Sequence, residues 1–391
     1  MKNKILSIIL AVFVLLTSGC INNNNFKISN HEKKVIDPNI SILNEDKVVT
    51  NLKLQGDLKN IYYADGNKIL ILADKLYLYD LGAREVIAEA PKLLFNRENY
   101  WVIENGYAVV GETLISRNDK VRAVKGVRNY NCIFYDHNLN KVAEFDFNKL
   151  VGDNAIGLDM ENISFSSDGT KVLYALTDGL YQYDFVKNKK STIVNLKSND
   201  YSERFGIVAF EQIDFTNYDK NIAFKAQSFD IPVLTDSSSF DSCGILNTNG
   251  SLLWNRGVFD DYKCKKITAY NDHILLAEDI TIASGRLFVF EYPSDKMISH
   301  ILLEKLESGS VSGSDFGKYF ATSIPNNDSW IIRIYNTKTG KLESEQQVSS
   351  GGKEYMAQDP IIKIIDDTKT CIMLFGSKRD DILTKMVVSQ F

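Results

Sequence analysis

The sequence is poor in the residues that most often form metal centres. It contains 4 histidines and 5 cysteines in 391 residues. It has neither an HExxH pattern nor a CxxC or Cys/His cluster at the spacing of a zinc site. The histidines lie far apart, at His31, His137, His273 and His300. A net charge of −5 leaves no general basic excess, which argues against a nucleic-acid-binding protein. We therefore expect no metal, no cofactor and no nucleic-acid partner.

The first twenty residues resemble the signal sequence of a bacterial lipoprotein. Lys2 and Lys4 form a short positive region, Ile5 to Leu16 is an apolar run too short to span a bilayer comfortably, and the segment from Leu16 to Cys20 resembles a lipobox. The resemblance implies that residues 1–19 are removed and that the thiol of Cys20 carries diacylglycerol. The mature protein would then be held on the cell membrane by its acyl chains, on the extracytoplasmic side. An ordinary signal peptide or an uncleaved anchor helix is the alternative.

Proline is also scarce, and its distribution bears on the domain organisation. The 6 prolines are scattered, and no Pro/Gly/Ser-rich stretch interrupts the body of the chain. The one clear tether follows Cys20 and includes four successive asparagines, Asn22 to Asn25, which are too polar to pack into a core. We therefore expect a signal peptide at 1–19, a lipidated cysteine and polar tether at 20–45, and one domain at 46–391.

Four cysteines remain in that domain, namely Cys132, Cys243, Cys264 and Cys371. Outside the cytoplasm an even number permits two disulfides, and Cys243 and Cys264 are the pair nearest in sequence. However, Cys132, Cys243 and Cys371 lie in strongly apolar runs that are typical of strands, which favours small buried thiols at these three positions.

The domain repeats a short apolar pattern seven times. Each copy is a run rich in Ile, Val, Leu, Tyr or Phe that ends in a polar residue, and the copies recur at about 50 residues, a period typical of propeller blades. The copies are 76–80, 132–136, 180–184, 243–247, 287–291, 332–336 and 385–389. Two further strands are expected before each copy, joined by a tight turn rich in Asp, Asn and Gly. These turns are expected at 65–66, 105–106, 167–169, 217–219, 271–272, 315–317 and 366–367.

Segment 162–196 contains one whole repeat, which reads as a four-stranded antiparallel meander. No helical period of similar length follows the signal, so we expect an all-β β-propeller of seven four-stranded blades. The last repeat lacks its outer strand, and an unassigned strand is expected at 48–54. Pairing of this N-terminal strand with the last blade would close the ring. Six blades, eight blades and a β-sandwich are the alternatives.

The hairpin from Phe165 to Tyr174, with the sequence FSSDGTKVLY, resembles the FSPDG hairpin of TolB-like and WD40-like propeller repeats. The Tyr-Asp pair that ends several third strands is similar to the Trp-Asp of WD40 repeats. The Gly-His dipeptide of WD40 blades is missing, and Ser167 replaces the proline. The resemblance implies a divergent bacterial propeller of the lipoprotein or quinoprotein-like kind, a fold that carries both binding modules and enzymes.

Long connections are expected on one face, because second-to-third-strand loops and blade-to-blade loops emerge together. The second blade inserts about 113–130 with five basic residues, and the fourth inserts about 229–241, which is acidic and serine-rich. The segment 325–330 is expected at the equivalent place in the sixth blade. The candidate interaction residues of this face are Arg117, Lys120, Arg122, Lys125, Arg128, Tyr201, Phe229, Phe240 and Trp330.

Three functions remain open at this point. The first hypothesis is a non-enzymatic lipoprotein whose propeller binds a protein partner at the membrane surface, since charges of both signs and aromatic residues suit such a surface. The second is an extracytoplasmic enzyme, such as a quinoprotein-like dehydrogenase, a lyase or a glycan hydrolase, although the sequence shows no convergent catalytic groups. The third is a glycan or small-ligand binder that stacks its ligand on Trp330, Phe240 and Tyr201.

Overall fold

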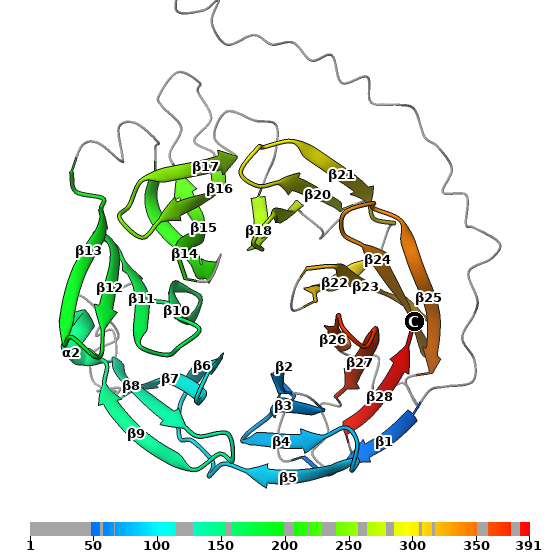
Figure 1. Ribbon diagram of the computed structural model, residues 1–391. Coiled ribbons are helices and arrows are strands. Elements are labelled where there is room, and N and C mark those ends of the chain that lie inside the picture. The colour runs from blue at the N-terminus through cyan, green and yellow to red at the C-terminus, as the bar shows by residue number, and fades with distance from the viewer. Residues whose placement is uncertain are drawn as a thin grey trace, which may run out of the picture. The chain divides into compact units, whose positions relative to one another are not determined.

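The structure is a computed structural model that describes residues 48–54, 58–65, 67–114, 128–152, 158–198, 207–216, 219–228, 240–256, 264–278, 285–304, 307–314, 317–349, 359–376 and 384–391. In these residues, 28 strands form seven four-stranded antiparallel sheets. The sheets are arranged radially as the blades of a β-propeller (Figure 1). The predicted all-β class, the seven blades and the four strands per blade are therefore confirmed.

Each of the first six blades is a simple meander in chain order. Blade 1 contains β2 (Asn60–Asp65), β3 (Lys68–Leu72), β4 (Leu76–Asp80) and β5 (Glu85–Glu89), and blade 2 contains β6 (Arg97–Ile103), β7 (Gly106–Leu114), β8 (Arg128–Tyr135) and β9 (Lys141–Asp146). Blade 3 contains β10 (Ile163–Phe165), β11 (Lys171–Leu176), β12 (Gly179–Asp184) and β13 (Lys189–Asn195), and blade 4 contains β14 (Ile207–Thr216), β15 (Asn221–Ser228), β16 (Phe240–Asn247) and β17 (Leu252–Arg256). Blade 5 contains β18 (Cys264–Ala269), β19 (His273–Glu278), β20 (Arg286–Glu291) and β21 (Met297–Leu302), and blade 6 contains β22 (Ser308–Gly313), β23 (Tyr319–Asn326), β24 (Ser329–Asn336) and β25 (Leu342–Ser349).

Helical structure in the described residues is limited to α2 (Asn148–Val151) and the 3-10 turn η2 (Met160–Asn162), both between blades 2 and 3. No helix in this part of the chain has the length and apolar character needed to cross a bilayer.

The ring is closed by the N-terminal strand. Blade 7 has the strand order β1-β28-β27-β26, in which β1 (Val48–Leu52) lies outside β26 (Ile361–Ile365), β27 (Thr370–Phe375) and β28 (Thr384–Gln390). β1 runs antiparallel to β28, with Val48 opposite Val388 and Leu52 opposite Thr384. The predicted pairing of the two chain ends is confirmed.

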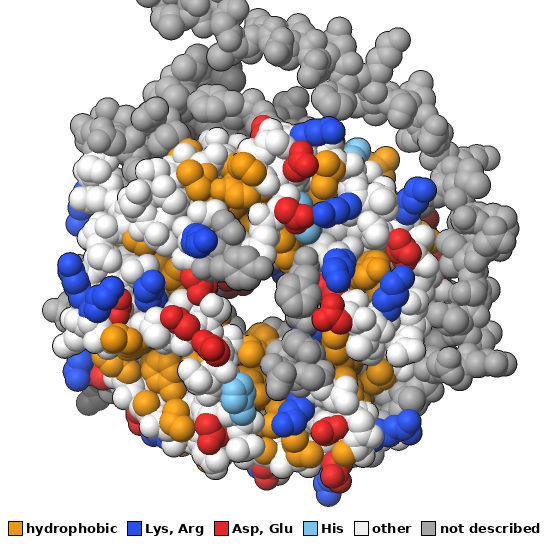
Figure 2. All heavy atoms as spheres, in the orientation of Figure 1, with side chains coloured by type: hydrophobic (Ala, Val, Ile, Leu, Met, Phe, Trp, Pro, Cys, Tyr) orange, Lys and Arg blue, Asp and Glu red, His pale blue; other side chains and the backbone are white. Residues whose placement is uncertain are grey.

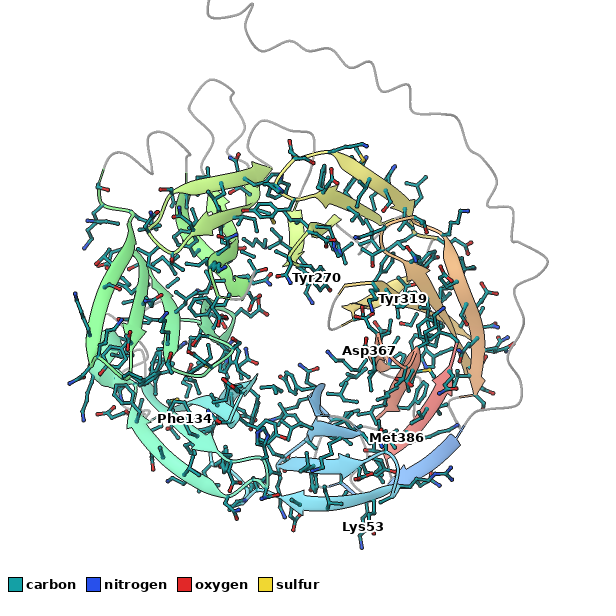
Figure 3. All side chains as sticks on the ribbon, viewed as in Figure 1. Lys53, Phe134, Tyr270, Tyr319, Asp367 and Met386 are labelled. Atoms are coloured by element: carbon teal, nitrogen blue, oxygen red, sulfur yellow. The ribbon has the colours of Figure 1, made fainter. Side chains whose placement is uncertain are left out.

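The core is divided among the interfaces between neighbouring blades. Seven clusters of buried side chains are found in the described residues, one between each pair of adjacent blades. Met386 and Leu52 of blade 7, for example, pack against Ile61 and Ile69 of blade 1. Lys53, next to Leu52, points away from the ring (Figure 3). Because both faces of each sheet are covered, the third strands are apolar throughout rather than alternating.

The polar residue that ends the repeat has a local structural role in five of the seven copies. Asp80 Oδ1 accepts hydrogen bonds from the amides of Gly82 and Ala83, at 2.8 and 2.9 Å. Asp136, Asp184, Asn247 and Asn336 bind turn amides in the same way. Side-chain oxygens of Asp and Asn stabilise tight turns by this bond. The recurring Tyr-Asp pair is thus explained by the turn from the third strand to the fourth.

The cysteines follow the sequence-based interpretation only in part. Cys132 and Cys371 are free and buried, and burial raises the pKa of the Cys371 thiol to about 12. Both are the inert core thiols that the apolar runs predicted. Cys243 is disulfide-bonded, so its interpretation as a third buried thiol is wrong. An apolar strand accommodates either state of a cysteine, because a disulfide is as compact and apolar as the residues that surround it.

Candidate interaction surface

The meander topology gives the propeller two unlike faces. We call the end with the second-to-third-strand and blade-to-blade connections the loop face, and the opposite end, with all the first-to-second and third-to-fourth-strand turns, the turn face. The segments between β7 and β8 and between β15 and β16 both belong to the loop face. The prediction that these two long connections share one face is therefore confirmed.

Turns of neighbouring blades are linked on the turn face. The amide of Ser167 donates to Asp219 Oδ2 at 2.9 Å, and Ser167 accepts from the amide of Glu104 at 2.7 Å. Between blades 5 and 6, the buried His273 lies 3.0 Å from the carbonyl oxygen of Gly317 through Nε2. His273 is the first residue of β19, directly after the turn predicted at 271–272. These bonds join neighbouring blades directly at the turn face.

Most of the predicted interaction residues lie outside the described part of the chain. This holds for Cys20 and for Arg117, Lys120, Arg122, Lys125, Tyr201 and Phe229. Phe240 begins β16, but only its backbone is described. Arg128 and Trp330 are the two predicted site residues whose side chains are placed.

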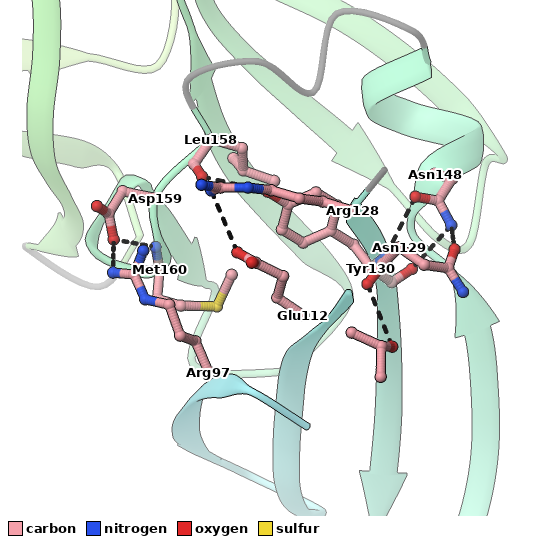
Figure 4. Close-up of polar contacts among 10 residues, drawn as sticks. Arg97, Glu112, Arg128, Asn129, Tyr130, Asn148, Leu158, Asp159 and Met160 are labelled. Atoms are coloured by element: carbon pink, nitrogen blue, oxygen red, sulfur yellow. Dashed lines mark hydrogen bonds and ion pairs between the residues drawn. The ribbon is translucent and has the colours of Figure 1, made fainter. Parts of the chain in front are cut away.

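Arg128 is paired with a buried carboxylate (Figure 4). It begins β8, and its Nη1 lies 3.4 Å from Oε2 of Glu112 on β7. The side chain of Glu112 is 4% exposed, whereas that of Arg128 is 45% exposed. A hydrogen bond with Tyr130 and the charge of Glu112 raise the pKa of the Arg128 guanidinium. Arg128 therefore neutralises a buried charge at the base of the β7–β8 connection, while its own side chain remains about half exposed.

A second ion pair lies beside the first on the loop face. Arg97 Nη2 is 2.6 Å from Oδ1 of Asp159, which also accepts a hydrogen bond from the amide of Met160 at 2.6 Å and so caps η2 (Figure 4). In the register of blade 2, Arg97 and Glu112 face each other across β6 and β7. Both Arg97 and Asp159 are about half exposed, so this pair remains accessible to a ligand or partner. Exposed pairs of this kind contribute little to stability, about 0–1 kcal/mol.

Trp330 does not lie on the surface. It is 2% exposed and packs between blades 6 and 7 with Ile332 and Val348. The segment 325–330 is not an insertion but the end of a tight hairpin, in which Pro325 pairs with Trp330 and Asn326 with Ser329. The prediction of Trp330 as an exposed aromatic residue is therefore wrong. Trp330 is instead a large apolar side chain that fills a blade interface.

A buried charge cluster in blade 6 was missed by the sequence analysis. The side chain of Glu307, just before β22, has no exposed surface, and its Oε2 lies 3.2 Å from Nη1 of Arg333 on β24. Its Oε1 accepts hydrogen bonds from Thr322 Oγ1 at 2.6 Å and from Tyr335 Oη at 2.8 Å. Arg333 Nε is 2.8 Å from Oε2 of Glu345 on β25. The sequence signal was an arginine inside the apolar run 331–335.

This charge cluster joins β23, β24 and β25 to the connection before β22. Burial lowers the pKa of Arg333, but the hydrogen bond to Glu345 and the charge of Glu307 outweigh that effect and raise it above its ordinary value. Burial and the charge of Glu307 likewise raise the pKa of Tyr335. The arginine is therefore ionised and the tyrosine neutral at any physiological pH. Since every donor in the group has a carboxylate acceptor, the arrangement is structural, fixing the blade-to-blade connection onto β24.

An opening runs through the centre of the ring, and acidic and basic side chains are mixed around it (Figure 2). Asp214 lies on β14, the innermost strand of blade 4, and is solvent-accessible. The surrounding protein nevertheless desolvates the carboxylate and raises its pKa to about 6, even though Gln212 Nε2 donates to it at 3.0 Å. No group of three or more metal-ligating side chains occurs among the described residues.

Comparison with known proteins supports the fold. No protein-family model and no curated protein sequence matches the chain. Among solved structures, the chain is similar to the crystal structure of the Cps50 (Swd1) β-propeller domain of Myceliophteria thermophila, with a TM-score of 0.53 and 11% identity over 88% of this chain and 100% of that domain. At this identity the likeness shows the fold alone, which is a WD40-like seven-bladed β-propeller. In all, 904 chains of solved structures match, so the fold by itself selects no activity.

Proposed function

We propose that the protein is an extracytoplasmic lipoprotein whose propeller is a non-enzymatic protein-interaction module. The observation that carries the interaction role is the position of the two long connections, 115–127 and 229–239, which both leave the loop face of a ring whose other face is linked turn to turn. A rigid scaffold that displays variable loops on one face is a common arrangement for binding sites. The basic character of 115–127 and the acidic residues of 229–239 suit a protein surface of mixed charge.

The disulfide at Cys243 supports the proposed compartment, because disulfides persist mainly outside the cytoplasm. The disulfide also limits how the proposed lipid anchor can be attached to Cys20. Cys132 and Cys371 are free thiols, so the partner of Cys243 is Cys20 or Cys264. If Cys20 carries a lipid, the partner must be Cys264, which begins β18 in the blade next to β16.

We expect the mature chain to begin at an acylated Cys20 and to partition with membranes, and we expect Cys20→Ser to abolish lipidation and release the protein into the aqueous fraction. Intact-mass analysis and detergent-free fractionation of the native host membrane measure this. The matched control is Cys132→Ser, which alters a buried thiol of blade 2 and should leave the lipid in place. Peptide mapping without reduction should link Cys243 to Cys264. A disulfide between Cys243 and Cys20 would contradict the anchor directly.

Charge reversal in the β7–β8 connection, with Arg117, Lys120, Arg122 and Lys125 replaced by glutamate, should weaken capture of the partner while leaving the melting temperature unchanged. Surface charges act mainly on association rate and on salt dependence, and their effect on stability is usually within about 0.5 kcal/mol. Arg128 is left unchanged, because its loss would leave Glu112 buried without a counter-ion. The measurement is quantitative affinity purification from native membranes at two salt concentrations.

The matched control reverses the same number of charges on the opposite face, at the exposed residues Lys220, Lys318, Lys341 and Lys369. This control variant should keep the partners that the loop-face variant loses. Equal loss from both variants would mean that net charge, and not the loop face, governs capture, and the proposed interaction role would fail. The glycan-binding alternative is weakened already, because Trp330 is buried and cannot stack on a sugar.

A further inference from the structure

A register shift recurs in the outer strands of five blades. Close to the turn face, one residue of the outer strand has no partner opposite it on the third strand, and the pairing resumes at the next residue. The residues at this position are Ile87, Val142, Leu253, Ile298 and Glu343, in blades 1, 2, 4, 5 and 6. Bulges of this kind change the direction of a side chain at the edge of a sheet.

Four of these five side chains are aliphatic, and three of them are exposed to water. Val142 is 62% exposed, and Ile87 and Leu253 are 43% and 45% exposed. Ile298 lines a pocket of about 460 Å³ together with Tyr292, Pro293 and Lys338. Blade 3 places Val186, 76% exposed, in the turn just after β12. Single exposed aliphatic residues are ordinary, but here four successive blades place an exposed one at the same end, and the fifth places the half-buried Ile298 there. We call this set, Ile87, Val142, Val186, Leu253 and Ile298, the aliphatic rim.

Cationic side chains accompany the aliphatic rim. Exposed lysines or arginines lie in or beside the third-to-fourth-strand turns of blades 1, 2, 3 and 5, and these are Arg84, Lys141, Lys187, Lys189 and Lys296. Carboxylates lie among these cations, since Lys141 is paired with Glu144 and Lys187 with Asp184. Aliphatic side chains with long cationic neighbours suit the boundary between lipid headgroups and acyl chains. Anionic headgroups add about 1 kcal/mol for each nearby lysine or arginine.

The chain joins the propeller at this same end. β28 begins at Thr384, after a loop-face connection, and ends at Gln390 on the turn face. Because Val48 lies opposite Val388 and Leu52 opposite Thr384, β1 starts at the turn face and runs toward the loop face. Only 27 residues separate Cys20 from Val48, a reach of at most about 90 Å. A lipid on Cys20 would therefore hold the turn face at an effective concentration at which weak contacts suffice.

We infer that the turn face, through its aliphatic rim, rests on the surface of a phospholipid bilayer that contains anionic lipid. The inference rests on the proposed lipid anchor for its tether. In this orientation the loop face points away from the membrane and toward partners.

The test compares fluorescent probes on the two faces of the lipidated protein in vesicles of phosphatidylcholine and phosphatidylglycerol. One variant carries Val142→Cys and the other Leu94→Cys, each labelled with an environment-sensitive dye. Leu94 is 82% exposed in the blade-to-blade connection after β5, on the loop face. The unsubstituted chain is the labelling control, because its free thiols at Cys132 and Cys371 are fully buried. Quenching by lipids with nitroxide-labelled acyl chains is measured for both probes.

We expect several-fold stronger quenching of the probe at Val142 than of the probe at Leu94. Replacing Ile87 and Leu253 with glutamine should reduce the quenching at Val142 without changing the melting temperature, since both side chains are exposed. Equal quenching of the two probes, or stronger quenching at Leu94, overturns the inference. A second arm attaches the chain from residue 21 on, which lacks the Cys20 thiol, through an N-terminal histidine tag to a nickel-chelating lipid. If native Cys20 proves unlipidated, the proposed anchor fails, whereas the rim is still tested in this second arm.

Discussion

Removal of β1 is expected to lower the free energy of unfolding by more than about 5 kcal/mol, which is enough to unfold a domain of ordinary marginal stability. The deletion leaves β28 as an unpaired edge and removes Leu52 from the interface between blades 7 and 1. It also opens the ring at the point where the two ends of the chain meet. A propeller has only short exposed edges when it is closed, so an open blade is also expected to promote aggregation.

Point variants distinguish the loss of ring closure from the effect of merely shortening the chain. Leu52→Ala should cost about 2–5 kcal/mol, because Leu52 is buried among Met386, Ile61 and Ile69. Lys53→Ala, at the neighbouring exposed position, should have an effect within about 0.5 kcal/mol. Urea-induced unfolding of the two variants and of a chain lacking residues 48–52 gives the comparison. If the deletion unfolds at the same urea concentration as the unchanged protein, β1 does not close the ring in solution.

The features that could be predicted from the sequence are those that depend on local pattern. Third strands are mostly apolar because both of their faces are covered, and in five blades the repeat ends in an Asp or Asn that stabilises the next turn. The strand at 48–54 could be predicted because the last repeat is one strand short, and an unpaired edge is unfavourable. Such features repeat, so a wrong assignment in one blade is corrected by the others.

The errors concern residues whose environment is set by other strands, in the same blade or in the next one. Pro325 and Trp330 looked like a loop because proline and Asn-Asn-Asp interrupt the apolar pattern, but they pair across a hairpin, and blade 7 covers the indole. The basic character of Arg128 is evident in the sequence, whereas the buried Glu112 that neutralises it is visible only once β7 and β8 are in register. Charge counts along a loop therefore overstate the charge that a partner would meet.

The charge cluster of blade 6 also could not be predicted from local sequence pattern. Glu307 and Arg333 are separated by 26 residues and lie in different strands or connections, so their pairing depends on blade register. A carboxylate in an ordinary polar connection gives no signal of burial. Only the arginine within the apolar β24 departed from its surroundings, and a buried charge requires a partner.

Loss of one member of this charge cluster is expected to destabilise the protein strongly. Glu307→Leu leaves Arg333 buried without its central carboxylate and leaves the hydroxyls of Thr322 and Tyr335 without their acceptor. Breaking a buried ion pair on one side typically costs about 3–5 kcal/mol. Glu343→Gln, at the exposed bulge of β25 in the same blade, is the matched control and should change stability by no more than about 0.5 kcal/mol. Thermal and urea-induced unfolding measure both.

The double variant Glu307→Leu with Arg333→Met distinguishes a cluster held by charge from one held by packing. When both charges are replaced by apolar side chains of similar volume, the desolvation cost of each disappears, and much of the lost stability should return. The double-mutant cycle should therefore give a coupling energy of about 1–3 kcal/mol between the two positions. If Arg333→Met adds its full cost to that of Glu307→Leu, the two side chains act independently, and the buried pair does not hold the connection before β22 onto β24.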